Sequence, residues 1–213
     1  MAAPTKQTDE GWLVNGPESA RTTLALAHGA GAGMDTEFMD FFAEHLAGRG
    51  VKVVRFEFPY MMDRRRTGKR RPPDREPRLR TSWLELCEAW GKTRLVIGGK
   101  SMGGRIATMI ANEADVAGVV CLGYPFHPSG KPERVRTEHL RELTVPTLIV
   151  QGERDALGNK QEVQGYKLSR RISIHWLTDG DHSLKPRKKS GRTTQENWAE
   201  AVDVIREFLG SLD

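Results

Sequence analysis

The stretch that decides the fold of this chain reads Leu95-Val96-Ile97-Gly98-Gly99-Lys100-Ser101-Met102-Gly103-Gly104. Glycines stand two residues before and after Ser101, where side chains would collide if a strand turned sharply into a helix. An apolar run precedes the serine, and residues 102–112 have the apolar composition of a buried helix. The segment therefore predicts a serine nucleophile on a strand–turn–helix, with helix N–H groups facing a developing oxyanion. The alternative is a glycine-rich turn with an incidental serine.

Short β-branched runs alternate with helical patterns along the rest of the chain. This alternation predicts an α/β protein with a mostly parallel sheet covered by helices on both faces. With 213 residues and no evident linker, we expect one compact domain, 1–213, with about six to seven strands and a minimal lid. Strands are expected at 22–27, 51–58, 94–98, 116–122, 147–151 and 172–177, with an edge strand at 11–14. Helices are expected at 36–47, 83–90, 102–112, 159–169 and 193–209.

Two later loops offer partners for the serine. Asp155 lies just past the strand expected at 147–151, and His182 lies in the loop after the last strand. Because the carboxyl ends of parallel strands meet at one edge of the sheet, both side chains are expected beside Ser101. We expect His182 to act as general base and then general acid, and Asp155 to orient its imidazole. Glu153 is the competing acid.

Five further histidines compete with His182. His45 falls within an expected helix and His175 within an expected strand, so both are expected to be structural. His139 lies in a polar stretch and is expected to be solvated, whereas His28 and His127 follow strands. None of the five combines a loop position with a place after the acid in the chain.

A second glycine-rich segment, His28-Gly29-Ala30-Gly31-Ala32-Gly33, follows the first expected strand. Its small residues would let the backbone approach a substrate carbonyl. We expect an oxyanion hole made by the N–H of Met102, directly after the nucleophile, and the N–H of Ala30. A flexible turn is the alternative. The glycine spacing does not match a dinucleotide or phosphate-binding loop, so no nucleotide cofactor is expected.

Composition restricts the class of protein. Hydrophobic residues make up 38% and charged residues 29%, and no apolar run approaches the roughly 18 residues of a membrane span. Residues 1–11 lack the apolar core of a signal peptide, so a cytoplasmic location is expected, as a monomer or weak homodimer. Cys87 and Cys121 are expected to be buried free thiols. No metal-ligand cluster is evident, so neither a metal nor a cofactor is expected.

The net charge of +5 is concentrated in two segments. Residues 63–80 hold nine Arg or Lys and three Asp or Glu, and residues 185–192 add five basic residues and no acidic one. Both segments leave the expected carboxyl edge of the sheet. We therefore expect a small-molecule substrate with an anionic group, bound by Arg64, Arg65, Arg66, Lys69, Arg70 and Arg71. Solvated loop charges are the alternative. Nucleic-acid binding is not expected, because no recognised module is present.

Four motifs together resemble a known family. They are H-G-A-G at 28–31, G-x-S-x-G at 99–103, G-x-x-D at 152–155 and G-D-H at 180–182. Together they resemble the compact, dienelactone-hydrolase-like α/β-hydrolases over residues 20–212. Two further segments, 58–61 and 122–128, resemble the branch that includes testis-expressed protein 30 and the third subunit of the non-specific lethal histone acetyltransferase complex.

The resemblance implies an α/β-hydrolase fold and an esterase-like serine hydrolase. It implies Ser101 as nucleophile, Asp155 as acid and His182 as base. It implies no substrate, and serine stands where dienelactone hydrolase itself uses cysteine. Because the branch includes members thought to act as scaffolds, a non-catalytic interaction protein on a hydrolase fold is the alternative function.

Overall fold

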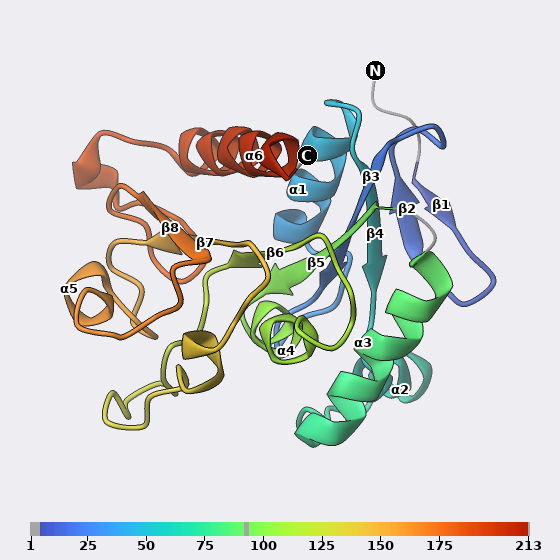
Figure 1. Cartoon of the computed structure of the whole chain (residues 1–213), viewed down its shortest axis with the longest axis horizontal. Coiled ribbons are helices and arrows are strands. Elements are labelled where there is room, and N and C mark those ends of the chain that lie inside the picture. The colour runs from blue at the N-terminus through green and yellow to red at the C-terminus, as the bar shows by residue number, and fades with distance from the viewer. Residues whose placement is uncertain (1–4, 92–93, 213) are drawn as a thin grey trace.

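The computed structural model describes residues 5–91 and 94–212, and a single sheet runs through its centre (Figure 1). The strand order is β1-β2-β4-β3-β5-β6-β7-β8. Strands β3 to β8 pair in parallel, whereas β1 and β2 pair antiparallel at one edge. The strands are β1 (Lys6–Gln7), β2 (Leu13–Asn15), β3 (Thr22–Ala27), β4 (Lys52–Phe56), β5 (Arg94–Lys100), β6 (Gly118–Leu122), β7 (Thr147–Gly152) and β8 (Ile172–Leu177).

The predicted, mostly parallel sheet is confirmed, but eight strands exceed the six to seven expected. The additional strand, β1, has two residues and both are exposed. A strand of this kind buries no apolar side chain, so the alternation of apolar and polar residues that predicts strands is absent from its sequence.

Helices cover both faces of the sheet. Helices α1 (Glu37–Ala47) and α6 (Thr194–Ser211) pack together on one face, and α3 (Glu76–Trp90) and α4 (Met102–Ile110) pack on the other. The remaining helices, α2 (Pro59–Thr67) and the single turn α5 (Lys160–Val163), lie in connections at the carboxyl ends of β4 and β7. None of the helices within the described part of the chain combines the length and apolar character needed to cross a bilayer.

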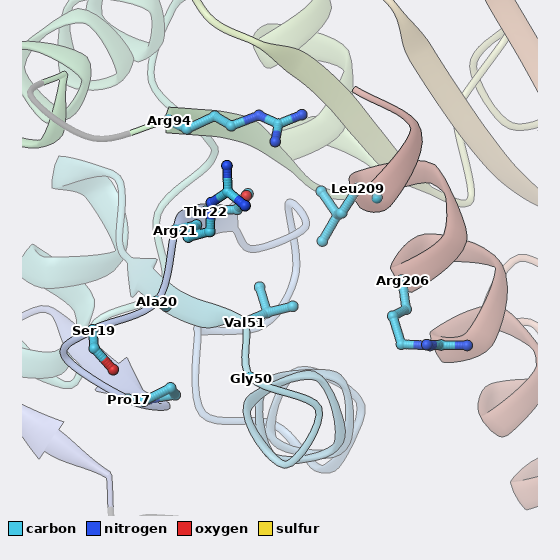
Figure 2. A pocket seen from close by; sticks show the side chains of 11 residues that line it. Pro17, Ser19, Ala20, Arg21, Thr22, Gly50, Val51, Arg94, Arg206 and Leu209 are labelled. Carbon is cyan, nitrogen blue, oxygen red and sulfur yellow. The ribbon is translucent and has the colours of Figure 1, made fainter. Parts of the chain in front are cut away.

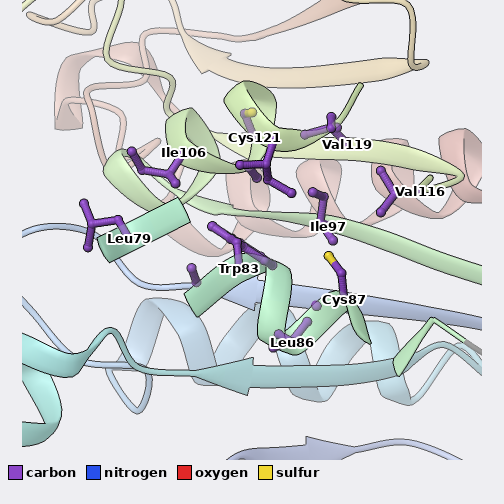
Figure 3. Packing of buried hydrophobic residues seen from close by; sticks show 14 of the residues in the cluster. Leu79, Trp83, Leu86, Cys87, Ile97, Ile106, Val116, Val119 and Cys121 are labelled. Atoms are coloured by element: carbon purple, nitrogen blue, oxygen red, sulfur yellow. The ribbon is translucent and has the colours of Figure 1, made fainter. Parts of the chain in front are cut away.

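Trp83 of α3 lies at the centre of the core between the sheet and helices α3 and α4 (Figure 3). Its side chain is completely buried and meets the ring of Phe56 edge-on, with 4.7 Å between the ring centroids. Burial of a tryptophan removes roughly 150–250 Å² from water, which makes it a main contributor to this layer. Cys87 and Cys121 lie in the same cluster as free, buried thiols, as predicted.

The basic segment 63–80 is more helical than the sequence indicates. It was expected as a loop, and the strand before it was expected to continue to residue 58. The chain instead leaves β4 at Phe56, and Pro59 begins α2, which ends at Gly68 in the left-handed conformation. Helix α3 starts at Glu76, seven residues before the expected start. Proline fits the first turn of a helix, where its missing N–H has no partner to lose, so Pro59 and Pro77 mark helix starts rather than a loop.

The helix expected at 159–169 is also shorter than predicted. Helix α5 forms one turn, in which Asn159 and Glu162 make a reciprocal capping box. Gln164 caps the helix, and the chain turns toward β8 from Gly165. The connection between β6 and β7 contains only the short 3-10 turn His139–Arg141.

Candidate active site

Ser101 lies on a strained turn between β5 and α4. Its backbone has φ 52° and ψ −112°, a conformation that non-glycine residues rarely adopt and that is found mainly at functional sites. The flanking glycines allow the close packing of this turn against the end of β3. A Cβ atom would lie 2.1 Å from the carbonyl oxygen of Ala27 if added to Gly99, and 2.5 Å from it if added to Gly103. The predicted nucleophile turn is therefore present, and we refer to residues 98–104 as the elbow.

The three side chains selected from the sequence meet above the elbow. The Oγ of Ser101 lies 2.8 Å from Nε2 of His182, and Nδ1 of the same ring lies 2.7 Å from Oδ2 of Asp155. Asp155 is fully buried, whereas His182 is partly exposed. Because an ionised carboxylate only accepts hydrogen bonds, Nδ1 carries the proton and Nε2 is left to accept the serine hydroxyl. This arrangement can remove the serine proton.

Asp155 is held by its own loop and by Gln151, the penultimate residue of β7. One carboxylate oxygen accepts the N–H of Leu157 at 2.8 Å, and the other accepts the amide of Gln151 at 2.9 Å. Glu153, the competing acid, instead bonds the ammonium of Lys160 at 2.9 Å, which holds the pKa of Glu153 below its usual value. The supporting role of Gln151 was missed from the sequence, where a polar residue ending an apolar strand was the only signal.

Helix α6 holds the loop that carries His182. The amide of Asn197 donates to backbone carbonyls on both sides of His182, at 3.1 and 2.9 Å, and the indole of Trp198 donates to a third at 3.0 Å. Within the loop, the carboxylate of Asp181 accepts two backbone N–H groups. The loop that carries the imidazole is therefore held by its own residue Asp181 and by Asn197 and Trp198 of α6.

Comparison with known proteins shows the family and the fold of the chain. A family model described as an alpha/beta hydrolase domain matches residues 20–210. The chain belongs to this α/β-hydrolase family. Two solved structures of similar size share the fold of the α/β-hydrolase domain. One is a serine hydrolase without a lid from Xanthomonas campestris, with 17% identity, TM-score 0.67 and coverage of 97% of this chain and 94% of the other.

The other is an esterase from Pyrococcus furiosus, with 16% identity, TM-score 0.68 and coverage of 99% and 90% of the two chains. A dienelactone hydrolase from Anabaena variabilis is also similar, with 19% identity, TM-score 0.62 and coverage of 95% of each chain. At these identities the similarity to the three solved structures establishes the α/β-hydrolase fold alone.

The glycine-rich loop of this α/β-hydrolase is held in place by a buried histidine. His28 donates from Nδ1 to the carbonyl of Gly29 at 2.6 Å and accepts the N–H of Phe58 on Nε2 at 3.1 Å. Burial lowers the pKa of His28, which favours the neutral ring that this pair of bonds requires. The hydroxyl of Tyr60 also donates to the carbonyl of Ala30 at 3.0 Å. The loop is therefore fixed rather than a flexible turn.

The remaining histidines of the α/β-hydrolase have structural contacts. His45 is exposed and stacks on Phe41, and His175 and His127 lie 2.8 and 3.4 Å from glutamate side chains. His139 was expected to be solvated, but it packs under α4 with its Nε2 3.0 Å from the hydroxyl of Thr108. Burial lowers the pKa of His139 to about 4, so it is neutral at pH 7.

A cavity of about 390 Å³ opens beside Ser101. Residues 29–33 of the glycine-rich loop, which include Ala30, line this cavity. The start of α1, Ser101 and His182 also line it. None of the described residues 124–146 between β6 and β7 lines it, which agrees with the minimal lid that was predicted. Met102, the other expected oxyanion residue, begins α4 directly after Ser101.

The six basic residues chosen as substrate contacts do not form the wall of this cavity. All six are described, and none is among the lining residues. The guanidinium of Arg64 donates to the carbonyl of Gly31, which lines the cavity, at 3.1 Å. Arg65 pairs with Glu57 and Asp35. The others are Arg66 and Arg71, which pair with Asp63, and Lys69 and Arg70, which are exposed.

A second hollow, of about 450 Å³, lies at the opposite edge of the sheet (Figure 2). It is lined by the amino-terminal ends of β3 and β5 and by the end of α6, with Arg21, Arg94 and Arg206 among its residues. In open parallel sheets ligands bind outside the carboxyl ends of the strands. The cavity at Ser101, which holds the nucleophile and base candidates, is therefore the candidate active site.

Proposed function

We propose that the chain is an esterase-like serine hydrolase that cleaves a small ester or related acyl substrate through an acyl-Ser101 intermediate. The observation that carries this proposal is the unbroken contact from Ser101 through His182 to Asp155, with separations of 2.8 and 2.7 Å. Both separations are within the range at which a proton is transferred along a hydrogen bond. The family and the fold support the same reaction class.

Acylation begins when Oγ of Ser101 attacks the substrate carbonyl carbon and His182 takes the hydroxyl proton on Nε2. The carbonyl oxygen becomes an oxyanion, for which we assign the N–H groups of Met102 and Ala30 as donors. Asp155 stabilises the imidazolium without taking its proton. When the tetrahedral intermediate collapses, the bond to the leaving oxygen breaks and His182 returns the proton to the departing alcohol.

Deacylation repeats these steps with water as the nucleophile. His182 removes a proton from a water molecule that attacks the acyl carbon, and then protonates Oγ of Ser101 as the acid product leaves. The open cavity supports a small or protruding substrate, because the described part of the chain provides no covering segment over it.

We propose that the site favours a substrate with an anionic group near the cavity mouth. Among the six basic residues expected to bind substrate, Arg64 contacts the carbonyl of Gly31 in the glycine-rich loop. A focused positive potential would raise the local concentration of such a substrate and would weaken with added salt. We also propose, from the likeness of segments 58–61 and 122–128, that the chain belongs to the branch that includes testis-expressed protein 30.

A panel of p-nitrophenyl esters that differ in acyl length and charge tests the function. We expect measurable turnover of short esters and a loss of at least about 1,000-fold in kcat/KM for Ser101→Ala. Ser129→Ala, the same change in an exposed loop, is the control and should keep its activity. Activity that survives unchanged in Ser101→Ala would contradict the assignment of the nucleophile. Failure of folded protein to cleave any ester would favour the non-catalytic interaction protein.

The same panel tests the anionic preference. We expect the ratio of kcat/KM for p-nitrophenyl hemisuccinate to that for the neutral butyrate to fall several-fold in Arg64→Gln and at high salt. Arg134→Gln, at an exposed arginine of another loop, serves as the control for net charge. Equal rates for both esters at low salt would show that the basic segment is only solvated charge.

A further inference from the structure

Lys100, inside the elbow, makes a contact that the mechanism above does not use. It is the last residue of β5 and directly precedes Ser101. Its ammonium donates a hydrogen bond to the backbone carbonyl of His182, while the neighbouring Ser101 bonds the imidazole of the same residue. Two consecutive residues of the elbow therefore hold the backbone and the ring of one histidine that lies 82 positions further along the chain from Lys100.

The end of β6 leaves space for this contact. Gly123 has φ +68°, and a Cβ atom added to it would lie 2.8 Å from the ammonium nitrogen of Lys100 and 2.7 Å from the carbonyl oxygen of His182. A side chain at residue 123 would therefore displace one of the two partners. This independent observation shows that three segments, the ends of β5 and β6 and the loop after β8, fit together around the bond.

The groups around the ammonium of Lys100 are either acidic or neutral. The carboxylates that act on its ammonium belong to Asp155 and Asp181, from the loops after β7 and β8. The other acidic groups of these loops are paired, Glu153 with Lys160 and Asp179 with two arginines. Helix α1 presents a neutral group, the ring of Phe38, whose centroid lies 5.1 Å from the ammonium. Lys100 is the only lysine or arginine among the described residues that line the cavity.

We propose that Lys100 is a positioning residue of the triad, which fixes the backbone of His182 and offsets the negative charge of Asp155 and Asp181 beside the imidazole. This inference rests on the proposed function of that triad. Burial lowers the pKa of Lys100 to about 8, and the two carboxylates act against this shift, so the ammonium form predominates at pH 7. Without the ammonium, two carboxylates would favour the imidazolium, and His182 would be protonated and inactive as a base up to a higher pH.

The test compares Lys100→Met, which keeps an unbranched side chain and removes the charge, with Lys100→Arg, which keeps a cation and a donor. For Lys100→Met we expect kcat/KM for p-nitrophenyl acetate to fall on the order of 10- to 100-fold, because the imidazole is less well placed. We also expect the acidic limb of the pH profile to move to higher pH by about one unit. Lys100→Arg should keep the position of that limb, even if its bulk near Gly123 lowers the rate. Lys131→Met, at an exposed loop lysine, is the control for net charge.

A titration of the His182 ring by NMR provides a readout that needs no turnover. We expect its protonation midpoint to be higher in Lys100→Met than in the wild type by the same amount, and to be unchanged in Lys131→Met. A folded Lys100→Met protein with an unchanged midpoint and a rate within twofold of the wild type would overturn the proposal. If the wild type cleaves no ester, the proposed function fails, and the NMR comparison alone still decides the role of Lys100.

Discussion

Gln151 helps to hold Asp155, the proposed acid of the triad, through its side-chain amide. Its amide nitrogen donates to Asp155 at 2.9 Å, and its amide oxygen accepts the backbone N–H of Tyr124 at 2.7 Å. The side chain is fully buried. It therefore joins the end of β7 to the segment after β6 and also directs the carboxylate toward His182.

Gln151→Leu should weaken both folding and catalysis. The change leaves a buried backbone N–H without its acceptor, so we expect the free energy of unfolding to fall by about 2 kcal/mol. We also expect kcat/KM to fall on the order of 10-fold as Asp155 loses one of its donors. Urea unfolding and ester hydrolysis measure the two effects. Gln161→Leu, at an exposed glutamine of α5, is the matched control, and equal stability of the two variants would refute this role.

At the residue scale, the sequence was sufficient to select three side chains that the structure brings together, Ser101, Asp155 and His182. Ser101 is marked by glycines at fixed offsets, and His182 and Asp155 by loops that follow buried strands. Gln151 and Lys100 carry no comparable local signal, because their roles depend on contacts with residues distant in the chain. Five histidines were set aside from their positions alone, but the burial of His139 became evident only from its packing under α4.

The contact between β3 and the elbow determines which backbone conformation the elbow can adopt. Ala27 and Gly99 are directly opposed in the register of the two strands, and the carbonyl of Ala27 occupies the space that a side chain at residue 99 or 103 would need. The strained conformation of Ser101 is thus imposed by the packing of neighbouring elements.

Gly99→Ala tests whether the packing of β3 against the elbow excludes a side chain at residue 99. The added methyl would approach the carbonyl of Ala27 to 2.1 Å, and Gly99 has φ +146°, so both sterics and backbone conformation oppose it. We expect a loss of more than about 3 kcal/mol in the free energy of unfolding, or no folded protein. Gly210→Ala, in α6 with open space around it, should instead be neutral or stabilise by up to about 1 kcal/mol. Similar unfolding midpoints for the two variants would contradict the packing account.

Elements were predicted well where they bury apolar side chains. Strands β3 and β8 have the expected bounds, and β4 to β7 differ at their ends. The errors occur where local signals oppose each other. No helix is expected from the sequence before residue 83 in the basic segment, but Pro59 and Pro77 occupy the first turns of α2 and α3, where proline is tolerated. The exposed strand β1 carries no apolar pattern at all.

At the scale of the whole molecule, one parallel sheet brings the parts of the site together. The elbow, the acid loop, the histidine loop and the glycine-rich loop all leave the carboxyl ends of β5, β7, β8 and β3. This convergence follows from topology and could be predicted from the order of strands and loops. The shape and lining of the cavity could not, because they depend on how side chains pack, and none of the six basic residues expected to bind substrate lines it.

The measurement that tests the central claim most directly is intact-protein mass spectrometry after treatment with a fluorophosphonate probe. This reagent reacts with a serine only when an adjacent base activates it. We predict one adduct per chain on the peptide that contains Ser101, absent in Ser101→Ala and formed far more slowly in His182→Ala. Folded wild-type protein that forms no adduct, or an adduct that persists in Ser101→Ala, would contradict the account.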